Sequence, residues 1–530
     1  MVSQYGFKFA IHLVTNHFGK IVAKVCETLF RKGPLSLGEI IRCTELTPEQ
    51  VKNSLLVLVQ HNCVQAYVPA DQFRGEDGSM ATVEYLALFD NIIHRLRFPK
   101  FLEIAKHQFD DEVSELLHPA HCSFEASQFN PVKCEKVLDG LLRDENPGAI
   151  EAVVRESFHK LLKARYIERC PAPEPVISTL IKAESAPRKR GSKMAKKFEA
   201  PETIEQRVLE AAVPGEAIRF AVTAYTLGNA DREAKSDDSS MVNVGDNSGG
   251  IANEGSILWR ANFEEFIRHL RHKLLVENER KRLDDGAATI LSAILDVTKT
   301  VEKKVKIEKS VPLSLDSIFT EVTKTEHGRT MTIDRVRASL VQLGCPQRNF
   351  DDSYSIDLKS IVEMARNEEV ESIVLKRFGS DAYRIFRLLS KSNCFLETDK
   401  IAESALVDKK ETPRLLYKLW KDNYLYMEKL VVTAAKQSRF MLWKVNKPLL
   451  WEYVLDEMYH AALNLSLRLA FEQEKDEDLL HVPADKLVPA DKSSEANALQ
   501  KRYRRLRDVL FLMGSSLMKL DDALMLFHDF

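Results

Sequence analysis

The chain has 530 residues, of which 45% are hydrophobic and 29% are charged, and its formal net charge at pH 7 is −2. This composition is typical of folded globular domains and excludes a chain that is disordered throughout. Because the net charge is close to zero, contact with a nucleic acid would depend on local basic patches. A chain of this length accommodates about three to five domains.

The cysteines and the apolar segments indicate a cellular environment. The eight cysteines occur singly, and no Cys-x-x-Cys motif is present. No apolar run approaches the ~20 residues of a membrane-spanning helix. The N-terminus lacks the order of charged, apolar and small residues that marks a secretory signal. We therefore expect an intracellular protein with reduced thiols.

Residues 1–88 are predicted to form the first domain. Apolar residues at helical spacing predict one long helix that ends at Gly33-Pro34, namely Ile11, Val14, Phe18, Ile21, Val25 and Leu29. A short helix is expected over residues 36–44, and Thr47-Pro48-Glu49-Gln50 has the capping pattern of a third helix. Alternation over residues 64–68 and again at 82–85 predicts two strands.

The end of this third helix has a sequence pattern that recurs twice. The copies share the offsets 0, 3, 4, 7, 8 and 9: Leu55-Leu58-Val59-Asn62-Cys63-Val64, Phe158-Leu161-Leu162-Arg165-Tyr166-Ile167 and Leu416-Leu419-Trp420-Asn423-Tyr424-Leu425. The first three positions lie on one helix face, a polar residue follows, and the period then changes to that of a strand. A helix that leads directly into a β-ribbon is typical of a winged-helix domain. We therefore predict a mainly α fold with short β wings, built from tandem winged-helix domains.

The second domain is predicted over residues 89–170 and is followed by a linker. A long helix is expected from Phe89, and a third helix over residues 149–165. Residues 171–255 have the Pro-rich, basic and Gly/Asn/Ser-rich composition of a flexible linker, although residues 218–227 are compatible with a strand. The basic run at 188–197 is compatible with a nuclear import signal, a phosphate-binding tail or a solubilising linker.

The third and fourth domains are predicted over residues 256–360 and 361–446. Helical periodicity resumes at Trp259, is broken near 284–286 and continues to about residue 300. Residues 313–320 and 334–343 are candidates for the second and third helices of this third domain. In the fourth domain the long helices include residues 378–389, and the third helix is expected to start near Glu411.

Residues 447–530 are predicted to form an antiparallel coiled-coil hairpin. Apolar residues alternate steps of four and three in two segments. These residues are Trp451, Leu455, Met458, Ala462, Leu465 and Leu469, then Leu499, Tyr503, Leu506, Leu510, Met513, Leu517, Leu520, Leu524 and Phe527. The regular 3.5-residue period favours a coiled coil over two amphipathic helices that pack separately on the protein.

Catalytic motifs are missing from the sequence. There is no phosphate-binding loop, no Gly-x-Ser-x-Gly and no His-Glu-x-x-His. One group of residues, His118, His121, Cys122 and Cys134, has spacing that resembles that of a zinc site. Prolines at 119 and 131 favour a connecting loop for this segment instead. We therefore predict a protein without catalytic residues, metal or cofactor.

Basic side chains suggest where a nucleic acid could bind. Lys410, Arg414, Lys418 and Lys421 lie opposite the apolar face of Leu416, Leu419 and Trp420, as on a recognition helix. Arg155 and Lys163, with His159, form a weaker version in the second domain. The alternative in each case is a solvated face without a ligand. The third helix of the first domain offers only Lys52 and His61, so it is better suited to docking a protein.

Several blocks of sequence resemble one family. His17-Phe18-Gly19-Lys20-Ile21-Val22, residues 50–62, Trp259-Arg260-Ala261-Asn262-Phe263 and Arg377-Phe378-Gly379-Ser380 with residues 384–388 are spread over much of the chain. Together they resemble the winged-helix subunit of eukaryotic RNA polymerase III, the largest member of its dissociable initiation heterotrimer. That family is similar to the large subunit of transcription factor IIE.

The resemblance implies four winged-helix domains, a coiled-coil hairpin and a nuclear location. It implies a non-catalytic subunit that helps to open promoters and dock initiation factors at genes for small structured RNAs such as tRNA and 5S rRNA. The implied partners are two sister subunits, the clamp of the largest subunit, the initiation-factor complex and promoter DNA, including single-stranded DNA. The alternatives are a winged-helix scaffold of another nuclear complex, similar to transcription factor IIE, the proteasome lid or the signalosome, and a free-standing DNA-binding regulator.

Overall fold

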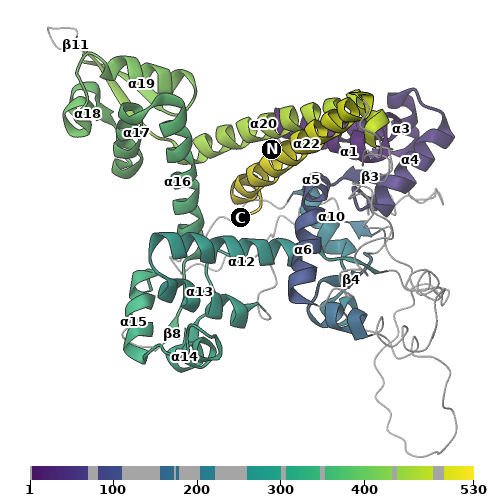
Figure 1. Ribbon diagram of the computed structural model, residues 1–530, viewed down its shortest axis with the longest axis horizontal. Coiled ribbons are helices and arrows are strands. Elements are labelled where there is room, and N and C mark those ends of the chain that lie inside the picture. The colour runs from purple at the N-terminus through teal and green to yellow at the C-terminus, as the bar shows by residue number, and fades with distance from the viewer. Residues whose placement is uncertain are drawn as a thin grey trace, which may run out of the picture. The chain divides into compact units, whose positions relative to one another are not determined.

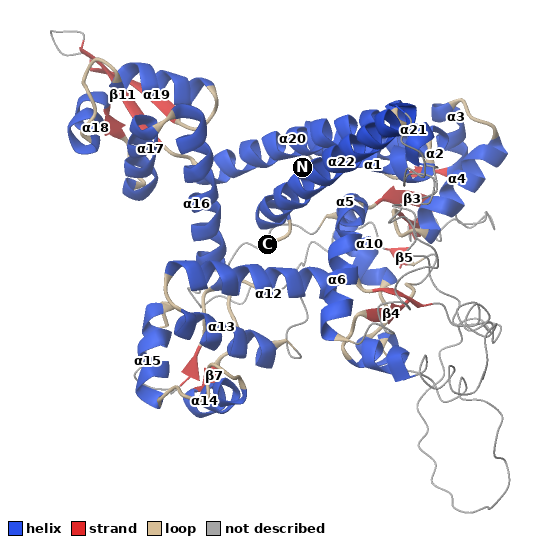
Figure 2. Ribbon diagram, in the orientation of Figure 1, coloured by secondary structure: helices blue, strands red, loops and turns tan. Residues whose placement is uncertain are grey.

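The computed structural model describes residues 3–69, 82–109, 156–171, 175–177, 203–220, 259–299, 306–345, 353–432, 438–480 and 494–530. Helices predominate, and the strands are short and form small sheets (Figures 1 and 2). Two compact units divide the chain: residues 10–266 form one, and residues 1–9 with 267–530 form the other. No described helix is both long enough and apolar enough to span a membrane.

The first winged-helix unit begins with two helices, so the prediction of one long helix is wrong. Its elements are α1 (Gln4–Phe18), α2 (Lys20–Lys32), β1 (Leu35–Ser36), α3 (Leu37–Thr44), α4 (Pro48–Gln60), β2 (Val64–Pro69) and β3 (Glu84–Ala87). Gly19 separates the first two helices with a φ of 86°, which glycine adopts without the steric cost of a side chain. The cap of α4 is confirmed, because the Gln50 N–H donates to Thr47 Oγ1 at 3.3 Å.

Part of the predicted linker is ordered on the first unit. The strand β5 (Val176–Ile177) pairs in parallel with β2 and gives a sheet with the order β1-β3-β2-β5. The helices α10 (Ile204–Ala212) and α11 (Glu216–Arg219) follow. The strand considered at 218–227 is not formed over Ile218 and Arg219, which are helical, and residues 221–227 lie outside the described residues. Val208 and Ile177 pack against Tyr67 of the wing, so the prediction of a linker throughout residues 171–255 is wrong for these segments.

The second unit has a wing made of strands far apart in sequence. It comprises α5 (Phe89–His94), the 3-10 turn η2 (Arg95–Arg97), α6 (Phe98–Gln108), a helix described over residues 156–163, and β4 (Ile167–Arg169). β4 pairs antiparallel with β6 (Trp259–Ala261). Trp259 was expected to begin a helix, and this expectation is wrong because its strand completes the second wing. The rings of Phe101 and Phe266 stack at 4.7 Å between centroids in the core of this unit.

The third unit matches the expected order of helices. It contains α12 (Phe263–Arg282), α13 (Asp285–Thr298), β7 (Leu313–Ser314), α14 (Leu315–Lys324), α15 (Ile333–Gln342) and β8 (Ser353–Tyr354). The break predicted near residues 284–286 is confirmed, because Asp284 caps α13 by accepting the Ala287 N–H at 2.7 Å. The helices predicted near 313–320 and 334–343 are confirmed as α14 and α15.

The fourth unit repeats the architecture of the first. Its elements are α16 (Leu358–Phe378), α17 (Ser380–Ser392), β9 (Leu396–Glu397), α18 (Thr398–Ala405), α19 (Thr412–Lys421), β10 (Tyr426–Val432) and β11 (Ser438–Lys444). Gly379, with a φ of 91°, separates α16 from α17 in the same way that Gly19 separates α1 from α2. In both places a phenylalanine precedes the glycine.

All four third helices end in the same hydrogen-bonded turn. A residue with positive φ follows each helix: Asn62, Arg165, Gly344 and Asn423. The next N–H donates to a carbonyl five residues earlier, for example from Cys63 to Leu58 at 2.8 Å and from Tyr424 to Leu419 at 2.8 Å. This geometry closes a helix and redirects the chain. The positive φ explains why the repeated pattern has a polar residue at this position. The third unit, with Gly344 at the same place, has the same turn although its sequence does not follow the pattern.

The C-terminal segment contains α20 (Lys447–Lys475), α21 (Glu477–Leu480) and α22 (Ser494–His528). α20 and α22 lie side by side (Figure 1), which confirms two paired helices, whereas supercoiling remains a prediction. The buried residues of α20 are Leu450, Val454, Met458, Tyr459, Ala462, Ser466 and Glu472, so Met458 and Ala462 of the expected stripe are buried. Trp451, Leu455, Leu465 and Leu469 are only half-buried. α1 also contacts α20, where the Tyr5 N–H donates to Asp456 Oδ1 at 2.9 Å.

Candidate nucleic-acid interface

Helix α19 of the fourth unit has one buried face and one exposed face. Leu416 and Leu419 are fully buried and fix the helix on its unit. Beyond the left-handed Asn423, the Tyr424 hydroxyl donates to Glu457 Oε2 at 3.1 Å, which ties the end of α19 to α20. Burial, followed by the charge of Glu457, raises the pKa of Tyr424 well above its usual range, so its hydroxyl stays protonated. The exposed face is therefore held in a fixed orientation on its unit.

The predicted cations lie on this exposed face with one exception. Arg414, Lys418 and Lys421 are exposed on α19, whereas Lys410 lies in the preceding turn, where its N–H donates to Asp408 Oδ1 at 2.9 Å. The Arg414 guanidinium is 3.7 Å from the Glu411 carboxylate. Lys418 and Lys421 make no ion pair within the described part of the chain. These two lysines are therefore the charges most available to an anionic ligand.

Two aromatic side chains share the exposed surface of α19. Tyr417 is 56% exposed, Trp420 is 37% exposed, and their ring centroids are 5.6 Å apart. The prediction that Trp420 belongs to the buried face is therefore wrong. The spacing of Arg414, Tyr417 and Lys421, at steps of three and four, was a readable signal that Tyr417 accompanies the cations. Exposed rings beside cations suit stacked bases and their phosphates.

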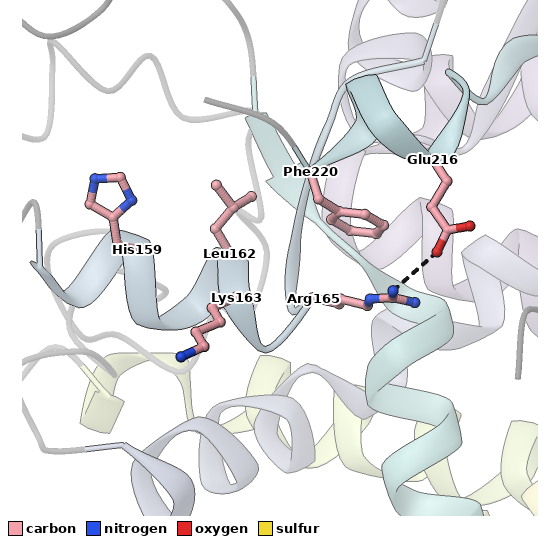
Figure 3. Close-up of a pocket in the computed structure, with 6 residues that line it drawn as sticks. All are labelled: His159, Leu162, Lys163, Arg165, Glu216 and Phe220. Atoms are coloured by element: carbon pink, nitrogen blue, oxygen red, sulfur yellow. Dashed lines mark hydrogen bonds and ion pairs between the residues drawn. The ribbon is translucent and has the colours of Figure 1, made fainter. Parts of the chain in front are cut away.

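The second unit presents a different group of cations around an open pocket. Lys163 is exposed at the end of the third helix and lines a pocket of about 390 Å³ with His159, Leu162, Arg165, Glu216 and Phe220 (Figure 3). The Arg165 guanidinium is 3.0 Å from the Glu216 carboxylate and lies over the Phe220 ring at 5.4 Å from its centroid. Arg155 lies outside the described residues, so a basic surface that it shares with Lys163 stays a prediction.

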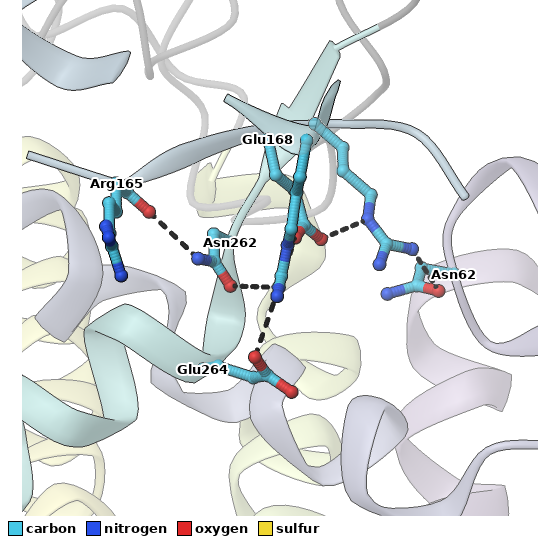
Figure 4. A network of polar contacts seen from close by, with 7 residues as sticks. Asn62, Arg165, Glu168, Asn262 and Glu264 are labelled. Atoms are coloured by element: carbon cyan, nitrogen blue, oxygen red, sulfur yellow. Dashed lines mark hydrogen bonds and ion pairs between the residues drawn. The ribbon is translucent and has the colours of Figure 1, made fainter. Parts of the chain in front are cut away.

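A buried carboxylate connects the first and second winged-helix units. Glu168 of β4 is 3% exposed and is bound by two arginines: Arg260 Nε donates to Oε1 at 2.7 Å, and Arg219 makes a close ion pair with Oε2 (Figure 4). Arg260 also donates to Asn62 Oδ1 at 2.8 Å, and the Asn262 amide donates to the Arg165 carbonyl at 2.9 Å. The left-handed residues at the ends of two third helices are thus held by one network.

The charge state of Arg219 follows from this network. Burial disfavours its positive charge, but Glu168 and then Glu264 more than compensate, so the pKa of Arg219 rises above its ordinary value. Glu168 is thus bound by two arginines, and Arg219 is also bound by Glu264, whose carboxylate is 3.1 Å away. Sequence reasoning missed it because its members come from segments that are nearly 200 residues apart and carry no local motif.

Three family models match this chain. The RNA polymerase III subunit RPC82 helix-turn-helix domain matches residues 8–68, RNA polymerase III subunit RPC82 matches residues 156–374, and the POLR3C C-terminal winged-helix domain matches residues 370–445. Together they cover well over half of the chain. The chain belongs to the RPC82 family.

Curated relatives agree with this assignment along the whole chain. A Bos taurus protein named DNA-directed RNA polymerase III subunit RPC3 is 26% identical over 90% of this chain and 86% of its own length. The protein of this name from Danio rerio is 25% identical over 88% of this chain and 84% of its own length. The Dictyostelium discoideum relative, also named as this subunit, is 21% identical over 99% of this chain and its entire length.

The third helix of the first unit has little positive charge in this RPC82-family chain. Burial, followed by the nearby Arg95, lowers the pKa of His61 to about 4, so this histidine is neutral at physiological pH. His17 has a pKa of about 4 for the same two reasons. Lys52 is the exposed cation of α4. With two neutral histidines and one exposed lysine, this surface offers little charge to a nucleic acid. Docking of a protein therefore stays the prediction for the surface of the first unit, whose wing is covered by β5 and α10.

Potential metal ligands are the last candidate feature. Among the described residues, no cluster of His, Cys, Asp and Glu side chains has the arrangement of a metal site. His118, His121, Cys122 and Cys134 lie outside the described residues.

Proposed function

We propose that this chain is a non-catalytic subunit of DNA-directed RNA polymerase III that acts in the nucleus during transcription initiation. The observation that carries the proposal is the match of three RPC82-family models to the chain. One matches the first winged-helix unit, one extends from the second unit into the fourth, and one matches the fourth unit. Its proposed partners are other polymerase III subunits, including two sister subunits and the clamp of the largest subunit, together with the initiation-factor complex. Nucleotide addition is assigned to the largest subunits of the enzyme.

The exposed face of α19 is the proposed contact with promoter DNA. Lys418, Lys421 and Arg414 would neutralise phosphates, and Lys410 would extend this surface at the start of the helix. Tyr417 and Trp420 would stack on bases where the strands have separated. Lys163 and Arg155 of the second unit are proposed as a further, weaker contact.

Affinity purification of the tagged chain from its native cells, followed by mass spectrometry, tests the assignment. We expect the two sister subunits and the largest polymerase III subunits in stoichiometric amounts. Recovery of a proteasome-lid, signalosome or polymerase II complex without polymerase III subunits would overturn the proposal. The purification is carried out once with the tag at the N-terminus and once with the tag at the C-terminus, so that displacement of a partner by the tag is detected.

A further inference from the structure

The first and fourth units have sheets of the same construction, but only one of them is complete. The repeated pattern aligns Val64 with Leu425, so β2 corresponds to β10, β3 to β11 and β1 to β9. The first sheet has the order β1-β3-β2-β5, and the fourth has the order β9-β11-β10. Within the described residues, no strand of the fourth unit occupies the place of β5.

In the first unit the outer edge of the wing is covered by the chain itself. The Val68 N–H donates to the Pro175 carbonyl at 2.9 Å, and Val68 lies beside Val176 in the register of β5. Val208 of α10 covers the adjoining face and is fully buried, and Tyr67 of that face is only 4% exposed. Every residue of β2 is buried.

In the fourth unit no segment among the described residues covers the corresponding edge and face. Tyr426 and Leu430 are both 49% exposed, and alternation along β10 places them on one face. Leu430 lies opposite Phe440 on β11, and the Phe395 ring lies 6.2 Å from the Tyr426 ring. β10 is an edge strand of seven residues, Tyr-Met-Glu-Lys-Leu-Val-Val, and the exposed Glu428 lies between Tyr426 and Leu430 on the same face. An edge strand of this length offers unpaired backbone groups to another strand.

We propose that β10 is the docking edge for an extended segment of a partner protein, which adds to the sheet as β5 adds to the first unit. The segment would run parallel to β10, and its apolar side chains would cover Tyr426 and Leu430. On the opposite face it would carry an acidic residue near Lys429, which is exposed and makes no ion pair among the described residues. This recognition is β-augmentation, in which backbone hydrogen bonds supply affinity and alternate side chains supply specificity.

A second copy of this chain is a poorer occupant of the edge. Two β10 strands paired antiparallel over their full length would place Lys429 opposite Lys429. Two strands paired in parallel and in register would place Glu428 and Lys429 each beside its own equivalent. Like charges in directly opposed positions destabilise a sheet, so the charges on β10 favour a different polypeptide.

The alignment with the first unit also identifies the backbone group that would bond to the partner. Lys429 corresponds to Val68, whose N–H points outward to β5. Lys429→Pro should therefore remove the outward donor while the bonds between β10 and β11 remain, since proline is tolerated at such positions of edge strands. Lys429→Ala removes the same side chain but keeps the N–H, so it is the matched control.

Photocrosslinking of the full chain in its native cells tests the proposal. A photoreactive phenylalanine analogue replaces Leu430, and the crosslinked peptide is sequenced by mass spectrometry. We expect a single segment of one partner protein, with alternating apolar residues and an acidic residue. Lys429→Pro should lower the yield about tenfold, as expected for the loss of one backbone hydrogen bond. Lys429→Ala should leave most of the yield.

Tyr426→Glu provides a second variant if Lys429→Pro alters the fold, which circular dichroism of the purified chain detects. It should lower the yield as strongly, because it charges the face that the partner covers. Crosslinks to another copy or to this chain itself, or equal yields from all variants, would overturn the proposal. A crosslink to one segment of a protein outside polymerase III would support the docking edge but contradict the proposed function. Failure of the docking proposal and failure of the proposed function therefore give different results.

Discussion

A residue in the left-handed region ends the third helix of each winged-helix unit. Asn62 and Asn423 suit this conformation, because asparagine tolerates it better than most residues, and Gly344 adopts it freely. Arg165 has no such intrinsic advantage. Its carbonyl is held by Asn262 and its guanidinium lies beside Glu216, so the surrounding network fixes the strained backbone. The polar position in the repeated pattern is thus a backbone requirement.

Asn423→Ala tests this requirement. Because alanine adopts the left-handed conformation at a cost of about 1 kcal/mol, the variant should destabilise the end of α19 by that amount, whereas Asn423→Gly should be neutral. Native-state hydrogen exchange of the amides in α19 and β10 measures the change in local opening. Asn464→Ala, at an exposed position within α20, is the control and should leave exchange unchanged. Equal protection in Asn423→Ala and the native chain would contradict the account.

The neutral histidines of the first unit predict a dependence of stability on pH. His17 and His61 have folded pKa values of about 4, below the value of about 6.5 in an unfolded chain. The unfolded state therefore binds more protons between these values, so stability is complete above pH 6.5 and falls as the pH drops towards 4. Hydrogen exchange of α4, corrected for its intrinsic pH dependence, should show this loss.

His17→Gln should make that pH profile shallower, because one of the two titrating groups is removed. His159→Gln, which changes an exposed histidine of the second unit, should leave the profile as it is. A flat profile for the native chain would show that these histidines do not titrate on unfolding in the way described.

At the scale of elements, the strands β4 and β6 depend on a single carboxylate. Glu168→Gln would leave Arg260, which is 18% exposed, without its anion, and would leave Arg219, which is 15% exposed, with Glu264 alone. Breaking a buried ion pair from one side costs about 3–5 kcal/mol. We expect faster exchange of the β4 and β6 amides, and Glu264→Gln, whose side chain is 56% exposed, should have a much smaller effect. Similar exchange in both variants would contradict this role.

The exposed face of α19 predicts a change in DNA binding. Lys418→Glu with Lys421→Glu should weaken crosslinking of the assembled polymerase to promoter DNA. It should also reduce the slope of log affinity against log salt by about 0.7–0.9 for each phosphate that these lysines neutralise in the native chain. The same two changes at Lys376 and Lys391, exposed lysines of α16 and α17, are the charge-matched control. An unchanged salt dependence would show that the exposed face of α19 is solvated and does not contact DNA.

For the molecule as a whole, local patterns predicted more than long-range ones did. The winged-helix units were predictable because helix caps, turns and strand periods each depend on a sequence window of about fifteen residues. The pairing of β4 with β6 and the return of β5 and α10 to the first wing were not predictable, since each joins segments separated by long stretches of chain. The spacing along α19 predicts the surface cations and is also consistent with Tyr417 beside them, whereas the exposure of Trp420 is known only from the structure.

Depletion and add-back of this chain most directly test its role as a non-catalytic initiation subunit. Polymerase III stripped of this subunit should extend RNA on a template with a preformed single-stranded bubble as fast as the complete enzyme. It should fail to start from a duplex promoter with its initiation factors, and the purified chain should restore that step. Loss of elongation on the preformed bubble, or full promoter-dependent initiation without the chain, would contradict the account.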